Sequence, residues 1–438
     1  MQAKSQHKLK NRIMPFKLGK TNDIITANAG LSIFGEFLYG IGLNKAIDEN
    51  LPRPGSNRGY LPSKYVMPLI LMLNGGGRAL EDIREISNDI GLRELLNIAN
   101  IPSSDAYGLW LRRTGRNGGL ERLQLVNNYY FCRYIEKEDT NNYTLDLDAT
   151  GIKSEKEEAK MSYKGFKGYM PLLGHIAENG LVILDEFREG NISPSTNNLE
   201  FIRKCVRLMP PGKKIKYLRA DSASYQSAIF NECESSSIKF VIGAKLDTSV
   251  KAAINNIKEE EWKSCEGFKI AETVHSLEKT KKSFRLIVIR YPYQKGIFEK
   301  EVNYEEKYTA IATNIPNSEM EALEVKQWYN GRGEYSENRI KELKNGFSME
   351  RMPCGDFKAN AVFFRIGVLS YNLFKMFQLK ILPKSYRKHQ IKTIRWKLYN
   401  IAGKIVYSGG IYLKVRNYIY ELFEKIRNNI YNFCCSYL

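Results

Sequence analysis

The stretch NYTLDLDATG, residues 142–151, decides the fold class because two kinds of side chain alternate along it. Leu145 and Leu147 alternate with Asp146 and Asp148, and a β-strand turns successive side chains to opposite faces. The stretch is therefore predicted to be a strand that presents leucines to one layer and both aspartates to the other.

Further strand and helix patterns follow this strand. MPLLGHIAE and GLVILDEFREG are strand-like, and the Asn179–Gly180 pair between them is a good hairpin signal. A helical pattern, a strand that ends in Asp221, a second helical pattern and the apolar run IKFVIGAKL come next. The predicted order is three strands, helix, strand, helix, strand, which is an α/β arrangement.

The charge of the chain predicts a polyanionic partner. The formal net charge is +19 over 438 residues, and a surplus of this size favours nucleic acid. The basic residues crowd both ends: the region beyond residue 375 has only Glu421 and Glu424 as acids, and the N-terminal arm carries Lys4, Lys8, Lys10, Arg12, Lys17 and Lys20.

Other classes of protein are disfavoured by the sequence. No apolar run is long enough to span a bilayer, so no membrane partner is expected. The seven cysteines form no CxxC pair, which predicts neither a zinc site nor a disulfide framework. A reducing, cytoplasmic compartment is expected.

Three carboxylates are candidates for a metal site. Asp148 lies in the first strand, Asp221 at the end of the fourth, and Glu337 on a later helix. Mg²⁺ prefers carboxylate oxygens, and two such ions can run chemistry at a phosphodiester. Asp146 is an alternative to Asp148 on the same face, and Glu334 and Glu342 are alternatives to Glu337.

The later helix carries a recognisable signature. YNGRGEYSENRIKELK, residues 329–344, is similar to the Tyr-Arg-Glu-Lys signature of bacterial insertion-sequence transposases, with matches at Tyr329, Arg332, Glu337 and Lys344. Four residues separate the arginine from the glutamate where the signature has three, and Gly331 and Gly333 offer a helix break beside Arg332.

Together with DLDATG, YKGFKGYMPLL, LRADSAS and VLSYNL, the signature makes nearly the whole chain resemble a DDE transposase, most of all the insertion-sequence thirteen-eighty group. The resemblance implies an α/β fold in which an RNase H-like catalytic domain, a mixed five-stranded sheet with helices, is interrupted by a β-rich insertion. The expected parts are a basic arm (1–23), a helical DNA-binding or assembly domain (24–140), the catalytic domain in two pieces (141–245 and 316–380), the insertion (246–315) and a basic C-terminal helical region (381–438).

The resemblance also implies an activity. Asp148, Asp221 and Glu337 are expected to bind two Mg²⁺ ions, with Mn²⁺ as a substitute, and to cut and join DNA at the terminal inverted repeats of the element. Double-stranded DNA, in those repeats and in the target, is the expected partner, held by a homodimer beside the bacterial nucleoid. Asp-x-Thr, present here as DAT, favours Asp148 over Asp146.

Five residues are expected to contact DNA. Tyr329, Arg332 and Lys344 are implied by the signature, whereas Arg219 is a further candidate because it lies beside Asp221. Trp262 is a candidate for stacking on an extruded base, although a core position in the insertion is the stronger interpretation. Two alternatives stay open: an RNase H-like nuclease without strand transfer, and an inactive transposon-derived DNA-binding protein.

Overall fold

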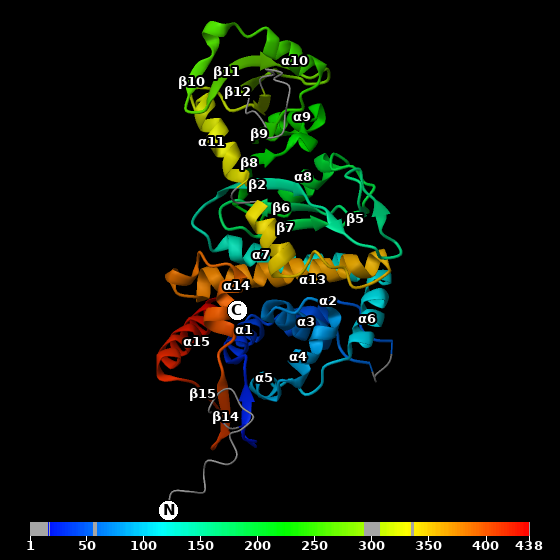
Figure 1. Cartoon of the computed structure of the whole chain (residues 1–438), viewed down its shortest axis with the longest axis vertical. Coiled ribbons are helices and arrows are strands. Elements are labelled where there is room, and N and C mark those ends of the chain that lie inside the picture. Colours follow the sequence, from blue (N-terminus) through cyan, green and yellow to red (C-terminus); the bar gives the residue numbers. More distant parts are fainter. Residues whose placement is uncertain (1–15, 17, 56–58, 293–306, 334–336, 438) are drawn as a thin grey trace, which may run out of the picture.

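A nine-stranded mixed sheet runs through the upper half of the molecule (Figure 1). The computed structural model describes residues 16, 18–55, 59–292, 307–333 and 337–437. In spatial order the strands are β10 (Lys263–Cys265), β11 (Phe268–His275), β12 (Phe284–Tyr291), β13 (Lys307–Thr313), β9 (Lys239–Gly243), β8 (Lys214–Ala220), β2 (Asn142–Ala149), β6 (Leu172–Ile176) and β7 (Val182–Glu186).

Along the chain, the last five of these strands and their helices follow the predicted order of three strands, helix, strand, helix, strand. β2 pairs in parallel with β8, and β8 in parallel with β9, while β6 and β7 form the antiparallel hairpin on the other side of β2. Gly180 has a φ of +80° in the hairpin turn, which glycine adopts without strain. The helices between the strands are α8 (Asn198–Arg207) and α9 (Ser227–Ser235).

The prediction of a five-stranded sheet is corrected by the pairing of β13. β13 pairs antiparallel with β9, so the strands expected in the insertion extend the same sheet to nine strands. The sequence pattern identified these strands but could not show the edge on which they pair. Two helices accompany this part, α10 (Thr248–Asn255) and α11 (Ala322–Arg332).

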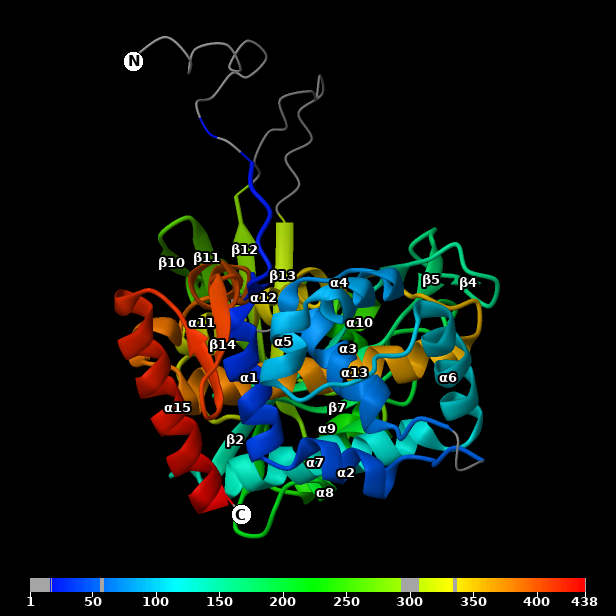
Figure 2. The ribbon, with the colours of Figure 1, turned by 90° about the horizontal axis from the view of Figure 1, so that it is seen from below.

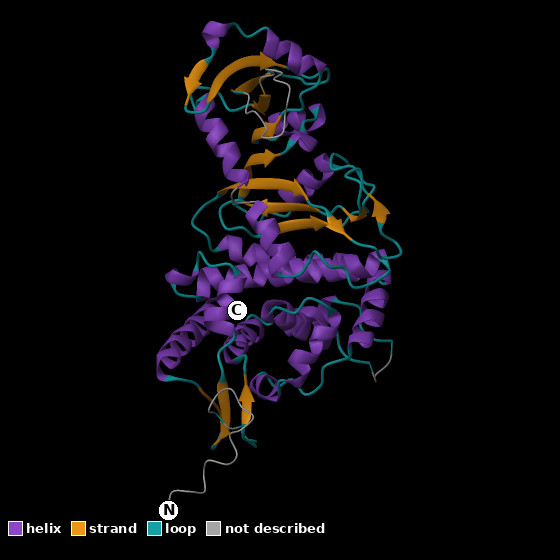
Figure 3. Cartoon of the chain, viewed as in Figure 1, coloured by secondary structure: helices purple, strands orange, loops and turns teal. Residues whose placement is uncertain are grey.

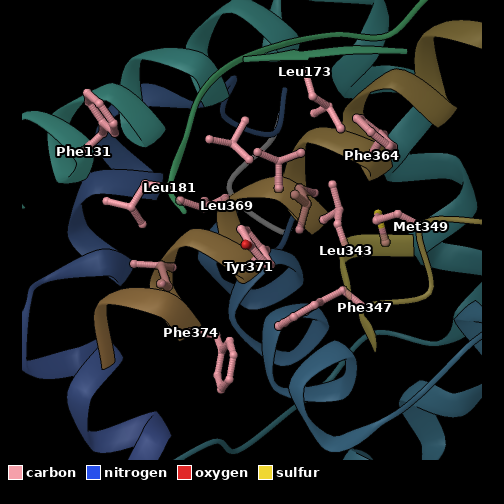
Figure 4. Close-up of a cluster of buried hydrophobic side chains, with 14 of the residues drawn as sticks. Phe131, Leu173, Leu181, Leu343, Phe347, Met349, Phe364, Leu369, Tyr371 and Phe374 are labelled. Carbon is pink, nitrogen blue, oxygen red and sulfur yellow. The ribbon is translucent and has the colours of Figure 1, made fainter. Parts of the chain in front are cut away.

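A long apolar helix, α13 (Phe357–Met376), lies between the sheet and the N-terminal helices (Figures 1 and 3). Nearly every residue of α13 is buried, because the helix is covered on both sides. Figure 4 shows side chains of α13, the hairpin and the segment around Leu343 packed in one cluster. The N-terminal helices are α1 (Ala29–Gly40), α2 (Leu43–Asn50), α3 (Ser63–Gly75), α4 (Ile83–Asn88), α5 (Ile90–Leu95), α6 (Ser104–Arg116) and α7 (Gly119–Glu136).

The C-terminal region differs from the helical region that was predicted. It contains helices α14 (Ile391–Ile394) and α15 (Asn417–Tyr437), but β14 (Gly403–Tyr407) and β15 (Ile411–Lys414) form a hairpin between them. β14 also pairs with β1 (Ile24–Thr26), which gives a small three-stranded sheet. The alternating runs around Ser-Gly-Gly at 408–410 carried this signal.

The two ends of the described chain therefore meet. α15 packs along α1, where Arg427 pairs with Glu36 at 2.8 Å (Figure 2). A second small sheet consists of β3 (Ile152–Lys153), β5 (Lys167–Tyr169) and β4 (Lys160–Met161). Within the described residues, no helix is both long and apolar enough to cross a membrane.

Candidate active site

Two of the three candidate carboxylates lie at the same edge of the sheet. Leu147 of β2 is in register with Ala220 of β8. Asp148 and Asp221 are the next residues along the chain, so they lie at the carboxyl ends of two neighbouring parallel strands. Asp221 also caps the short helix that follows, because its carboxylate accepts a hydrogen bond of 3.1 Å from the Ala223 amide. This cap fixes the direction in which the chain leaves β8.

Helix α11 brings Arg332 and Tyr329 to this edge. Arg332 is the last residue of α11, and its Nη1 lies 3.7 Å from Asp148 Oδ1. The Arg332 guanidinium carbon is 5.7 Å from the centre of the Tyr329 ring. Burial works against the charged form of Arg332, but Asp148, Tyr329 and Asp221 outweigh it and raise the pKa of the guanidinium. Arg332 therefore balances the carboxylates.

Gly243 at the end of β9 allows this approach of α11. A Cβ on Gly243 would lie 2.6 Å from Tyr329 Oη, which is shorter than a normal contact between carbon and oxygen. One of the two side chains would therefore have to shift. The same Cβ would lie 3.4 Å from the amide nitrogen of Ser222. The hydroxyl of Tyr329 therefore rests on bare backbone next to Asp221.

Glu337 is exposed and immediately precedes α12 (Asn338–Lys341), and Gly333 and Glu337 both have helical backbone angles. Arg332 is the last residue of α11 and Gly331 lies inside that helix, so the two glycines do not place Arg332 before the helix. The pKa of Asp148 is raised to about 6, mainly by burial, and the negative charges of Asp221 and Glu337 add to the rise while Arg332 opposes it. Glu337 thus acts electrostatically on the same site as the two aspartates.

Lys344 and Arg339 attach the Glu337 segment to the sheet. Lys344 lies in η5, a π-helical turn (Glu342–Gly346), and its Nζ donates to Gly151 O at 2.7 Å. Arg339 donates to Ile176 O at 3.1 Å and to Ala177 O at 2.6 Å, at the end of β6. Arg339 was not among the residues singled out from sequence, where it is one basic residue among several.

The prediction that Arg219 contacts DNA does not agree with its surroundings. Arg219 is 3% exposed, and it donates to both carboxylate oxygens of Asp146 at 2.7 and 2.8 Å. Its third nitrogen donates to Trp328 O at 2.8 Å. The buried guanidinium of Arg219 therefore links β2, β8 and α11. Asp146, which lies near Asp148 on the same strand, has a structural role as its partner.

Trp262 lies in the part of the sheet formed by the added strands. The guanidinium of Arg290 lies 4.3 Å from the centre of its ring, and Tyr308 is 6.1 Å away. The ring is partly buried and packs against the core. These contacts agree with the structural interpretation of Trp262, and they leave little ring surface for an extruded base.

The two alternatives to Glu337 are placed differently. Glu334 lies outside the described residues, as do the basic residues of the arm before residue 16. Glu342 points away from the aspartates and accepts a hydrogen bond of 2.8 Å from the Ile391 amide. Burial raises the pKa of Glu342, and Lys375 and the Ile391 amide oppose the rise. Glu342 therefore serves the packing of α14.

Three carboxylates of this kind are suitable ligands for a hard divalent cation. Burial is the main cause of the raised pKa of Asp148 and two negative neighbours add to it, an effect that a bound cation would relieve. Among the residues that the structure describes, no three histidine, cysteine, aspartate or glutamate side chains lie close enough together to hold a metal ion.

The sheet and the site define a class of protein: a mixed α/β protein with acidic residues at the ends of two parallel strands and a third, Glu337, immediately before α12. The chain matches the family described as Transposase DDE domain group 1 over residues 15–429, and it belongs to that family. It is therefore a DDE-type transposase.

A structure of the piggyBac transposase synaptic complex with hairpin DNA is similar to this chain, with a TM-score of 0.45 and 10% sequence identity. The similarity covers 93% of this chain and 80% of that chain. No curated protein matches the sequence.

Proposed function

We propose that this transposase cuts and joins DNA at the ends of a bacterial insertion sequence, with Asp148, Asp221 and Glu337 as its metal ligands. The observation that carries the proposal is that Asp148 and Asp221 lie at the carboxyl ends of two neighbouring parallel strands. Glu337 acts on the same place, because its charge adds to the rise in the pKa of Asp148 that burial mainly causes. Membership of the DDE transposase family supports the same chemistry. The insertion-sequence thirteen-eighty group is the proposed subfamily, from the signature at Tyr329, Arg332, Glu337 and Lys344.

The proposed cofactor is a pair of Mg²⁺ ions, with Mn²⁺ as a substitute. When bound, such ions lower the barrier to phosphodiester cleavage by activating the attacking oxygen and stabilising the leaving oxygen. Asp148 and Asp221 would hold them from the sheet, and Glu337 from the helical side. The exposure of Glu337 leaves it free to approach the aspartates.

The reaction has two stages in the same site. Water attacks a phosphodiester at the end of the element, which leaves a 3′-hydroxyl on one side of the break and a 5′-phosphate on the other. The 3′-hydroxyl then attacks a phosphodiester of the other strand or of the target DNA, and a new 3′-hydroxyl leaves. Joining in this way conserves the number of phosphodiester bonds and needs no external energy source.

The side chains around the carboxylates would position the DNA backbone. Arg332 can exchange Asp148 for a phosphate once the negative charge of the site is neutralised, because its Nη1 is buried without a hydrogen-bond partner. Tyr329 supports the arginine, and Lys344 is the second proposed phosphate contact. Terminal inverted repeats, a homodimer that holds two ends, and a cytoplasmic location beside the nucleoid complete the proposal.

The test uses the full chain with labelled duplexes that span the DNA on either side of its gene, incubated with Mg²⁺ or with EDTA. Metal-dependent nicks at a fixed boundary, followed by joined products, are expected for the wild type. Glu337→Gln should bind the duplex but not cut it, whereas the matched variant Glu342→Gln should still cut, since Glu342 faces α14.

Other results would refute parts of the proposal. Nicks without joined products would favour the nuclease alternative, and binding without cutting under any metal would favour the inactive DNA-binding protein. Cutting that persists in Glu337→Gln would remove Glu337 from the ligand set.

A further inference from the structure

One tryptophan projects into solvent far from the predicted stacking residue. Trp396 is 80% exposed, in a protein that has only four tryptophans. It lies in η8, a π-helical turn (Arg395–Tyr399) that continues α14. A single exposed aromatic ring is ordinary by itself, so the charge and rigidity of its surroundings decide whether it marks a contact surface.

The residues around Trp396 hold it outward. Ile391, Ile394 and Leu398 are buried and attach one side of the α14–η8 segment to the core. Arg395 donates to the carbonyls of Asn74 at 2.6 Å, Leu73 at 2.7 Å and Gly346 at 2.5 Å. With its immediate neighbour tied to three backbone carbonyls, Trp396 is presented from a rigid base.

The surface around the ring is basic. Lys392 precedes Trp396 by one helical turn, Lys397 follows it directly, and both are exposed. No aspartate or glutamate occurs between residues 381 and 420. Exposed cations beside an exposed aromatic ring match a nucleic acid, which offers both phosphates and flat bases.

The same segment is attached to the candidate active site. The Ile391 amide donates to Glu342 Oε1 at 2.8 Å, and a Cβ on Gly346 would come within 2.7 Å of the Ile391 side chain. Glu342 and Gly346 are the two ends of η5, which also holds Lys344 against Gly151. The base of Trp396 is therefore in direct contact with the segment that carries the proposed phosphate contact.

We propose that Lys392, Trp396 and Lys397, the tryptophan knob, bind DNA beside the cut, with the indole stacked on an unpaired base and the lysines on phosphates. This inference rests on the proposed function and adds a contact outside the signature residues. Stacking requires a base face that is free, and cutting and joining produce such unpaired bases next to the broken strand.

The experiment compares binding of two fluorescent DNAs by anisotropy: a blunt duplex and the same duplex with a short single-stranded tail. Trp396→Ala should weaken binding to the tailed duplex roughly 5- to 100-fold, the range for loss of one base stack, and affect the blunt duplex far less. Trp396→Phe should keep most of the affinity. Lys392→Ala and Lys397→Ala should weaken both DNAs alike and lower the slope of log affinity against log salt by roughly 0.9 each.

The matched control is Tyr420→Ala. Tyr420 is an exposed aromatic of the same region at 51%, but its hydroxyl donates to Glu424, so it lies in acidic surroundings. Its replacement should leave both affinities unchanged. Because Trp396 is exposed, Trp396→Ala should unfold at about the wild-type temperature, which separates lost contact from lost fold.

Four outcomes would overturn the inference. If the wild type cuts DNA but Trp396→Ala binds the tailed duplex with unchanged affinity, the tryptophan knob does not bind DNA, while the proposed function stands. Equal weakening on both DNAs removes the stacking. A change in oligomeric state with unchanged DNA affinity makes the knob a protein interface. A wild type that neither binds nor cuts either DNA refutes the proposed function itself, and the knob with it.

Discussion

Replacing Arg219, a buried residue next to the candidate active site, should lower the stability of the protein. The guanidinium of Arg219 is 3% exposed and Asp146 is 0% exposed, and two hydrogen bonds of 2.7 and 2.8 Å join them. Arg219→Leu leaves the Asp146 carboxylate buried without its cation. It also removes the donor to Trp328 O, which tethers α11.

The expected cost follows from this geometry. Removing one partner of a buried ion pair lowers the free energy of unfolding by about 3 to 5 kcal/mol, because the remaining charge is left uncompensated. With an unfolding entropy of about 2.1 cal/mol/K per residue, 438 residues give roughly 0.9 kcal/mol/K. If the chain unfolds as one unit, the melting temperature of Arg219→Leu should fall by about 3 to 5 °C.

Thermal unfolding of a set of variants tests this reasoning. Asp146→Leu combined with Arg219→Leu should recover most of the lost stability, since an apolar pair replaces the ion pair. Arg203→Leu is the control, because it removes a pair with Glu232 whose side chains are 42% and 23% exposed, and should cost no more than about 1 kcal/mol. A melting temperature of Arg219→Leu within about 1 °C of wild type, or a double variant as unstable as the sum of the single ones, would refute the argument.

Two further predictions concern His175 and Gly243. His175 is fully buried and its pKa is lowered from 6.5 to about 3 by burial and by Arg339, so the fold holds it neutral and loses stability as the pH falls below 6.5. Between about pH 7 and about pH 5, the free energy of unfolding measured with denaturant should therefore fall by about 2 kcal/mol more in the wild type than in His175→Phe. An equal fall in both proteins would contradict this sign. Gly243→Ala should impair metal-dependent cleavage, because its Cβ meets Tyr329 Oη at 2.6 Å, and Tyr329→Phe should partly restore it. A cleavage rate of Gly243→Ala equal to wild type would show that the close contact is unimportant.

Local patterns predicted the strands that carry the aspartates. The alternation of leucine and aspartate at 145–148 predicted β2, and the run before Asp221 predicted β8, because side-chain period is a property of a few neighbouring residues. The same local patterns predicted the order along the chain of the five strands and their two helices. Each of these inferences needed only residues that are close in sequence or a known family pattern.

Pairing between distant segments was beyond such patterns. The sequence identified β13 as a strand, but its pairing with β9 depends on which edge of the sheet is open. β1 and β14 are far apart in sequence, and they pair in a fold in which α1 and α15 also pack together. Long-range pairing depends on the closure of the whole chain rather than on local preference.

The sequence alone thus determined that this is a basic α/β protein of the DDE transposase type, with Asp148 and Asp221 in two predicted strands. Only the tertiary structure decided the roles of individual charged side chains. Asp146 and Arg219 look as exposed in sequence as Asp148 and Arg332, yet the first pair is buried and the second lies at the site. The physical reason is that the free energy of a charge depends on its burial and its partners, and both are supplied by residues distant in sequence.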